Sequence, residues 1–310
     1  MIWQQKHFFW LILATILYYL WFGLAVGLRP DHFLMYFTAL LLFSYSENSK
    51  QLFYGFSPFM FLGILYDSMR IWPNHSMHSV YISELYLLDK SLFGLNTDAG
   101  CLTLNEFFAT HTNTFLDIST ALFYLGWIPL PMAFAAYLWR KDRHLFFRFS
   151  YAYLLTNLIG FSLYYFFPAA PPWYIEKNGF QFIANPVRSA AGLLSFDEFF
   201  HIHFFKNLYE RNANVYAAIP SLHSAYPFIS LLYALQVPKK WPGLVFLTLS
   251  LGIWFSAIYL QHHYVIDVIL GALVALIAYL LLEFYLIKTV LARQLQWLLK
   301  RTKIENGAEE

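Results

Sequence analysis

Two histidines and an aspartate interrupt an otherwise apolar stretch near the C-terminal end of the chain. The stretch AIYLQHHYVIDVILGAL covers residues 257–273, and within it His263 and Asp267 are four residues apart. On a helix this spacing places both side chains on one face, where the carboxylate can accept a hydrogen bond from the imidazole and fix its tautomer. A charge at the bilayer centre costs about 2.5–3.5 kcal/mol, so we expect the cluster at an interface or in a wet interior.

Another histidine, His223, opens an apolar stretch about forty residues earlier. In AAIPSLHSAYPF, residues 217–228, we expect a helix with Pro220 in its first turn, where the missing N–H costs nothing. Two helix starts at one membrane face would place His223, His263 and Asp267 at similar depth. A carboxylate-backed histidine is a competent nucleophile toward phosphorus, and a second histidine can protonate the departing oxygen. Helix N-termini suit a phosphate, so the residues predict phosphoryl transfer with no cofactor and no metal.

The composition is that of an integral membrane protein. Of 310 residues, 59% are apolar, 21% are aromatic and only 12% are charged, whereas soluble domains carry about 25% charged residues. We therefore expect an all-α, polytopic helix bundle. The net charge of +2 is too small to suggest a nucleic acid as partner, and the single cysteine, Cys101, cannot form an intramolecular disulfide.

Apolar runs long enough to cross a bilayer recur along the chain. The polar stretch SENSKQ, residues 46–51, separates the second apolar run from the third. If these two runs are re-entrant segments that do not cross the membrane, six full spans remain. Otherwise we expect eight spans, at residues 8–27, 33–46, 52–68, 118–139, 145–167, 216–236, 242–261 and 263–287.

The distribution of basic residues orients these spans. The short loops WRKDR and VPKK are basic, which by the positive-inside rule places them and both termini in the cytoplasm. The long polar connections at 69–117 and 168–215, and with them the histidine site, then face the periplasm or a lumen. We divide the chain into N-terminal spans with an outer loop (1–117), a catalytic membrane core (118–287) and a basic tail (288–310) that lies along the cytoplasmic lipid surface.

Several motifs resemble those of a known family. PSLHS followed by HHYVIDVILG is similar to the second and third signatures of the type 2 phosphatidic acid phosphatase superfamily. YYFFPAAPPWY at 164–174, YLLDKSLFGLNT at 86–97 and LNEFFATH at 104–111 resemble segments of its inositol phosphorylceramide synthase branch, which is sensitive to aureobasidin. The resemblance covers roughly residues 80–285.

The resemblance implies a covalent phosphohistidine mechanism. His263 would be the nucleophile, Asp267 its orienting partner, and His223 the general acid toward the leaving alcohol and then the base for the acceptor. Ser221 and the backbone around it would help to hold phosphate oxygens. The spacing to Asp267 favours His263 over His262, which we expect to support the site or to contact the substrate.

The sequence departs from the phosphatase pattern where a serine–arginine pair is expected before the third-motif histidine. Ser256 fills the serine position, but Ala257 stands in place of the arginine, and the first phosphatase signature is not recognisable. A phosphomonoester dianion needs strong neutralisation, whereas a phosphodiester carries one negative charge, so the departure favours a phosphodiester donor. Basic residues of the outer loop remain as sources of a cation: Lys177, Arg188, Lys206 and Arg211.

The segment PAAPPWY allows two interpretations that can hold together. Pro172, Trp173 and Tyr174 either contact the substrate or form a rigid exit from the fifth span, with the two rings anchored at lipid headgroups. NHSMH at 74–78 and HIH at 201–203 lack a matching set of cysteines or carboxylates, so we expect no metal there.

Three functions remain to be compared. The leading hypothesis is a transferase that moves a phosphorylated headgroup from a phospholipid donor to a lipid alcohol acceptor; for this branch the headgroup is phosphoinositol, the acceptor is ceramide and diacylglycerol is released. The alternative is a lipid phosphate or polyprenyl diphosphate phosphatase with the same site. A transporter or scramblase without chemistry ranks last, because carboxylates in transporters are usually found mid-helix. Membrane lipids are the expected partners.

Overall fold

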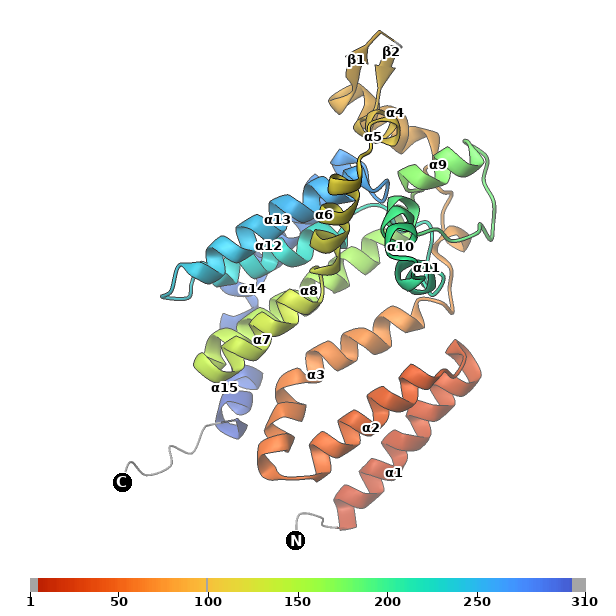
Figure 1. The fold of residues 1–310 in the computed structure, drawn as a ribbon. Helices are drawn as coiled ribbons and strands as arrows, with labels where there is room; N and C mark the ends of the chain where they lie inside the picture. Colours follow the sequence, from red (N-terminus) through yellow and green to blue (C-terminus); the bar gives the residue numbers. More distant parts are fainter. Residues whose placement is uncertain (1–4, 99, 303–310) are drawn as a thin grey trace. The chain divides into compact units, whose positions relative to one another are not determined.

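A computed structural model describes residues 5–98 and 100–302 and is helical almost throughout (Figure 1). The expected all-α fold of an integral membrane protein is confirmed. The chain forms two compact units, one made of Met1–Trp72 with Val290–Glu310 and the other of Pro73–Thr289. The functional division that we placed after residue 117 stays a prediction.

The first unit is a small set of helices from both ends of the chain. It contains α1 (Gln5–Leu20) with a π-helical turn (Trp21–Val26), α2 (Pro30–Ser44), α3 (Glu47–Ser68) and α15 (Ala292–Arg301). Helix α15 buries Leu295 and Leu298, and the Trp297 ring meets that of Tyr54 on α3 with centroids 5.6 Å apart. Basic residues of α15 are exposed, and the placement of the tail on the lipid surface stays a prediction. Residues 303–310 of that tail lie outside the described residues.

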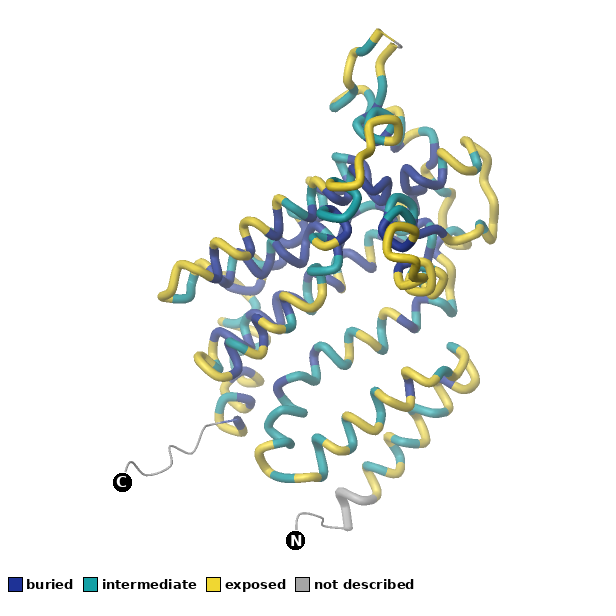
Figure 2. The backbone as a smooth tube through the Cα atoms, in the orientation of Figure 1, coloured by how far each residue is buried: buried dark blue, intermediate teal, exposed yellow. Residues whose placement is uncertain are grey.

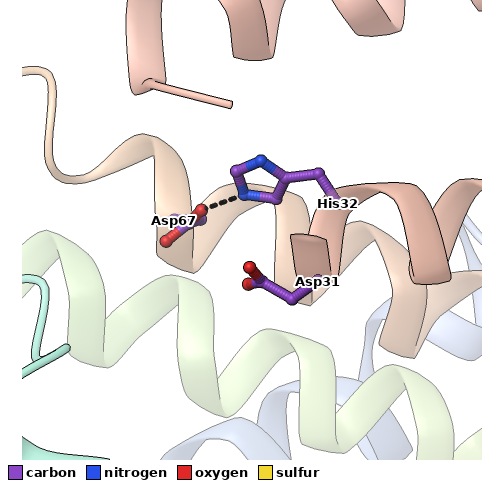
Figure 3. A group of neighbouring side chains, drawn as sticks. All are labelled: Asp31, His32 and Asp67. Carbon is purple, nitrogen blue, oxygen red and sulfur yellow. Dashed lines mark hydrogen bonds and ion pairs between the residues drawn. The ribbon is translucent and has the colours of Figure 1, made fainter. Parts of the chain in front are cut away.

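A cluster of charged side chains joins α2 to α3 in this unit (Figure 3). Asp67 accepts hydrogen bonds from His32 at 2.5 Å, from Arg29 at 2.7 Å and from Arg70 at 2.7 Å. Arg29 also pairs with Asp31 at 2.8 Å. Within the described part of the chain, Asp31, His32 and Asp67 form one group close enough to share a metal ion. Because two arginines already neutralise both carboxylates, we interpret the group as an ion-pair network.

The second unit combines long helices with short helices that connect them. The long helices are α6 (Thr114–Leu125), α7 (Pro129–Lys141), α8 (Arg143–Phe166), α12 (Leu222–Ala234), α13 (Trp241–Tyr259) and α14 (Val265–Phe284). The connections contain α4 (Ser83–Phe93), α5 (Leu104–Thr110), α9 (Pro172–Asn178), α10 (Leu194–Phe200), α11 (Phe204–Tyr209) and the antiparallel strands β1 (Leu95–Thr97) and β2 (Gly100–Leu102), besides short 3₁₀ turns.

Most predicted spans coincide with helices, and the fourth shows an unexpected break. Residues 118–139 form two helices, α6 and α7, separated by Gly126–Ile128. Pro129 and Pro131 have no N–H to donate to the carbonyls four residues earlier, so the helix cannot continue unbroken. Among the described residues, four segments are long and apolar enough to cross a membrane by themselves, namely Phe9–Val26, Thr114–Lys141, Trp241–Tyr259 and Val265–Lys288. The total number of spans stays a prediction.

The sixth predicted span begins later than expected. Residues 216–221 are not helical, and α12 starts at Leu222 with Ser221 as its N-cap. Pro220 therefore precedes the helix, and our placement of it in the first turn is wrong. Ala217 instead forms an isolated β-bridge with Ala169. The residues just before α12 therefore belong to the connecting segments of the unit, which we call its outer layer.

Helix α12 lies among α8, α13 and α14, where the buried residues of this unit gather (Figure 2). Its start packs directly on α14. Ser224 Oγ donates to the carbonyl of Val268 at 2.9 Å, and a Cβ on Gly271 would stand 2.0 Å from the carbonyl oxygen of Ser221. Only a glycine at position 271 lets the two helices approach this closely.

An ion pair between partly buried Arg148 and buried Glu283 joins α8, α12 and α14 at the opposite end of these helices. Arg148 Nε lies 3.0 Å from both carboxylate oxygens of Glu283, and the Tyr233 hydroxyl donates to Glu283 at 2.6 Å. Arg148 also donates to Gln236 at 2.9 Å. Because Glu283 is satisfied by a cation and a hydroxyl, its charge is tolerated among apolar helices.

We predict that Gly271→Ala separates α12 from α14. A methyl group at that position would overlap backbone that cannot rotate away, so we expect a loss of about 1–3 kcal/mol in the free energy of unfolding and a lower melting temperature in detergent. Gly23→Ala is the matched control, because a Cβ there meets nothing within 4 Å. Equal melting temperatures for the two variants would contradict the close packing described here.

Candidate active site

The structure brings the two predicted histidines into direct contact. His223 lies in the first turn of α12, and His263 lies in the turn between α13 and α14. Nδ1 of His223 is 3.2 Å from Nε2 of His263, and the ring centroids are 5.4 Å apart. His263 is buried, whereas His223 is partly exposed. Two imidazoles from separate helix starts therefore converge, as the sequence predicts.

The other nitrogen of His263 is held mainly by a backbone carbonyl. Nδ1 is 2.9 Å from the carbonyl oxygen of Ala218 and 3.7 Å from Oδ2 of Asp267. A carbonyl can only accept, so Nδ1 carries the proton and the lone pair of Nε2 faces His223. We expected Asp267 to fix this tautomer, but the carbonyl of Ala218 is the closer partner.

Asp267 holds the start of α14 and lies within ion-pair distance of His263. Its side chain is fully buried, and Oδ2 accepts the backbone N–H of Tyr264 at 2.9 Å. The backbone carbonyl of Asp267 accepts the N–H of Ser221 at 2.9 Å, which ties the starts of α14 and α12 together. Its charge can stabilise a positive imidazole at 263 even without a short hydrogen bond.

Ser221 caps the start of α12, and its expected contact with phosphate oxygens stays a prediction. It is fully buried, and its hydroxyl accepts the N–H of Ser224 at 3.3 Å as the N-cap of α12. Its own N–H is bonded to the backbone carbonyl of Asp267, so its polar groups hold the helix start. The N–H groups of Leu222 and His223 have no acceptor inside the helix, so these are the donors that α12 offers to an anion.

The turn that carries His263 is fixed by an asparagine that the sequence analysis did not single out. Asn105 on α5 is buried, and its Nδ2 donates to the carbonyls of Ile258 at 2.9 Å and His263 at 3.1 Å. Gln261 returns a hydrogen bond from Nε2 to the Asn105 carbonyl at 2.9 Å. Asn105 lies in the LNEFFATH motif, which was the only sign of its importance.

Ala257 shapes the same turn from within α13. Its carbonyl accepts the N–H groups of both His262 and His263, each at 3.0 Å, and its side chain is fully buried. An arginine side chain at this position would have to enter closely packed protein. The substitution that sets this chain apart from the phosphatase pattern therefore fits its surroundings.

The PAAPP segment positions the carbonyl that holds His263. Ala169 forms parallel bridges with Tyr81 on one side and Ala217 on the other. The N–H of Ala218 donates to the carbonyl of Ala169 at 3.3 Å. This short ladder sets the direction in which the Ala218 carbonyl points.

Trp173 and Tyr174 are buried in the outer layer of the unit. Pro172 begins α9, the N–H of Trp173 donates to the carbonyl of Gln261 at 3.1 Å, and the Tyr174 ring packs on that of Tyr216. Anchoring at lipid headgroups would require exposed rings, so that interpretation is wrong. The three residues support the turn before His263, and any direct contact with substrate stays a prediction.

Four aromatic rings form a continuous stack through the site. Tyr209, His262, Tyr124 and His223 follow one another with centroid separations of 4.7, 5.1 and 4.7 Å. The pKa of His262 is lowered to about 3, chiefly by burial and then by the charge of His263, so His262 stays neutral at physiological pH. Trp127 adds a ring contact to His223 at 4.5 Å. The stack restricts the orientation of His223, and no pattern in the sequence pointed to Tyr124.

Of the four basic residues of the outer loop, two form hydrogen bonds with other residues of the chain and two are exposed. Lys177 donates to Ser189 at 2.7 Å and Arg188 donates to the carbonyl of Asn212 at 2.9 Å. Lys206 and Arg211 are exposed. Which of the four neutralises a bound phosphate stays a prediction.

Comparison with known proteins identifies relatives along most of the chain. The sequence model of the PAP2 superfamily matches residues 84–281. Phosphoinositol dihydroceramide synthase of Bacteroides thetaiotaomicron is 41% identical over 287 residues, which cover 92% of this chain and 94% of that protein. No solved structure matches the chain.

Two fungal proteins are more distant relatives. The catalytic subunit of inositol phosphorylceramide synthase from Saccharomyces cerevisiae is 27% identical over 243 residues, or 74% of this chain and 56% of its own length. Inositol phosphorylceramide synthase of Candida albicans is 27% identical over 227 residues, or 70% of this chain and 45% of its own length. The chain thus spans about half the length of these proteins. The resemblance expected from the motifs is confirmed.

We predict that Asn105→Ala loosens the turn that carries His263. The substitution leaves the carbonyls of Ile258 and His263 without their donor, which costs about 1–3 kcal/mol for buried groups. We expect a lower melting temperature and a turnover number reduced by about tenfold or more. Asn207→Ala, at an exposed position on α11, is the control and should leave both quantities unchanged. Wild-type turnover in Asn105→Ala would show that the turn does not need this support.

Proposed function

This chain belongs to the PAP2 superfamily, and we propose that it transfers phosphoinositol from phosphatidylinositol to a ceramide through a phosphohistidine at His263. Its relatives indicate that it is a lipid phosphotransferase of the membrane. The observation that carries the proposal is the 3.2 Å approach of His223 Nδ1 to His263 Nε2, with Ala218 and Asp267 behind the second ring.

In the first step, Nε2 of His263 attacks the phosphorus of the donor. A bond forms between Nε2 and phosphorus while the bond from phosphorus to the glycerol oxygen breaks. His223, in its protonated form, gives its proton to that oxygen, and diacylglycerol leaves. The phosphorylated imidazole is positively charged because Nδ1 keeps its proton, and the Ala218 carbonyl and the Asp267 carboxylate stabilise that charge.

In the second step, His223 accepts the proton of the acceptor hydroxyl. The acceptor oxygen bonds to phosphorus as the bond from Nε2 breaks, which restores neutral His263 and protonated His223. The same histidine therefore serves as acid and then as base, and no net proton is consumed. Because the two ring nitrogens touch in this structure, a bound phosphoryl group must take the place of their hydrogen bond.

Two observations favour a phosphoinositol donor and a ceramide-type acceptor. The relative that covers nearly the whole chain is named phosphoinositol dihydroceramide synthase. Ala257, in place of an arginine, suits a singly charged phosphodiester. Dihydroceramide is accordingly one of the two acceptors that we propose to compare.

We propose a topology in which the site faces the non-cytoplasmic side and both termini are cytoplasmic. The basic loops that follow α7 and α12 support this orientation, because they lie at the helix ends away from the histidines. The eight-span arrangement is part of the same proposal.

The donor and acceptor can be tested with purified protein and phosphatidylinositol labelled in the inositol ring. We expect labelled phosphoceramide to form only when ceramide or dihydroceramide is added, because the acceptor must resolve the phosphohistidine. Release of water-soluble inositol phosphate without acceptor would indicate a hydrolase. An unconsumed donor would show that the phosphoinositol assignment is wrong.

We predict that His263→Ala abolishes turnover and that His223→Ala lowers it by about 10²–10⁴-fold, the usual contribution of a general acid and base. Donor labelled in its phosphate should give an acid-labile phosphoprotein with wild type and none with His263→Ala. Asp267→Asn should retain measurable activity, because the Ala218 carbonyl still fixes the tautomer. The control is His144→Ala, at an exposed position on α8. Normal turnover in either histidine variant would refute the assigned roles.

A further inference from the structure

A second buried carboxylate lies at the same end of α14 as Asp267. Asp89, on α4, is fully buried, and its Oδ1 accepts the backbone N–H of Ile266 at 3.0 Å across 177 residues of sequence. First-turn N–H groups have no partner inside a helix, and Tyr264 provides no side-chain cap for α14. Asp89 therefore caps α14 from a different helix.

Each of these two carboxylates, which lie together at the start of α14, has an oxygen that no hydrogen bond from the described residues satisfies. Oδ2 of Asp89 and Oδ1 of Asp267 are both buried without a hydrogen-bond partner in the described part of the chain. Lys90 follows Asp89 in sequence, but its Nζ binds the Tyr86 hydroxyl at 2.6 Å and Glu106 at 3.4 Å. Asp89 thus faces another carboxylate with the nearby cation bound elsewhere.

The charge of Asp89 depends on pH in the physiological range. Burial, followed by the charge of Asp267, raises the pKa of Asp89 to about 6, although hydrogen bonds from Ile266 and Val265 lower it. The other titratable groups at this corner are Tyr264 at the start of α14, Tyr86 on α4 and Glu106 on α5. Asp89 is therefore protonated below about pH 6 and negatively charged above it.

Ionisation of Asp89 makes the fold less stable. A carboxyl whose pKa is higher in the folded protein than in the unfolded chain binds its proton more tightly when folded. Asp89 consequently lowers the free energy of unfolding as the pH rises from about 4 to about 6. An asparagine could cap the same N–H without this loss, which suggests that the charge itself has a use.

We propose that Asp89 is a positioning residue for phosphoryl transfer, which caps α14 and adds a second negative charge behind His263. The inference rests on the proposed function, because the charge acts on the positive imidazole that forms when Nε2 bonds to phosphorus. Asp89 acts through Asp267 and the helix start that carries it. Two carboxylates together stabilise that positive charge more than Asp267 alone.

The variant Asp89→Asn separates the charge from the cap, because its side-chain oxygen can still accept the Ile266 N–H. At pH 7.5 we expect kcat for donor cleavage to fall about tenfold, the effect of one pKa unit, while KM changes by less than about twofold. Wild type should gain activity as the pH rises through about 6, and this rise should be absent from the variant. The melting temperature at pH 7.5 should equal or exceed that of wild type. Glu106→Gln is the charge-removing control, and it should keep the rise.

An unchanged kcat and pH profile in Asp89→Asn would overturn the proposal. So would a lower melting temperature or a failure to fold, since either would mark Asp89 as a purely structural residue. The comparison is a ratio to wild type, measured as diacylglycerol release, so it does not depend on the identity of the acceptor. A wild-type protein that cleaves the donor but forms no phosphoceramide would contradict the proposed function and leave this ratio readable.

Discussion

The hydrogen bond from Nδ1 of His263 to the carbonyl of Ala218 determines which ring nitrogen faces the second histidine. A side-chain partner could rotate, but this carbonyl is held in a ladder with Ala169, which is in turn paired with Tyr81. The tautomer of the proposed nucleophile is thus set by the backbone of three segments that are far apart in sequence. Asp267 adds its charge at 3.7 Å, so hydrogen bonding and charge stabilisation of the imidazole are divided between two groups.

The close approach of two helix starts supplies the rest of the site. Ser221 caps α12 and donates its N–H to the backbone of Asp267, while Gly271 leaves room for the two helices to touch. These contacts use polar groups of the two helix starts, and they bring His223 to the ring of His263. The aromatic stack then limits how far His223 can rotate, so little conformational freedom remains to be lost when a substrate binds.

The sequence was sufficient to predict the all-α membrane fold and the convergence of His223, His263 and Asp267, because apolar runs and helix starts are local signals. It did not predict Asn105 or Ala218, since Asn105 acts on backbone carbonyls far away in the chain and Ala218 acts through its own carbonyl on the side chain of the distant His263. The N-cap role of Ser221 was missed because an N-cap serine and a ligand-binding serine look alike in sequence. The anchoring interpretation of Trp173 and Tyr174 was wrong because aromatic residues near a predicted span end were assumed to be exposed, whereas these two rings are packed among the outer connections. The Pro129 and Pro131 pair was visible, but its effect on the fourth span was overlooked.

The pair of Arg148 and Glu283 has a mechanical consequence for substrate entry. It joins α8, α12 and α14 at the ends remote from the two imidazoles, and the Tyr233 hydroxyl strengthens that joint. At the other end, Ser221 and Ser224 tie the start of α12 to Asp267 and Val268 on α14. Helices held at both ends cannot spread apart, so the two rings must part by movement of their side chains when a phosphoryl group enters.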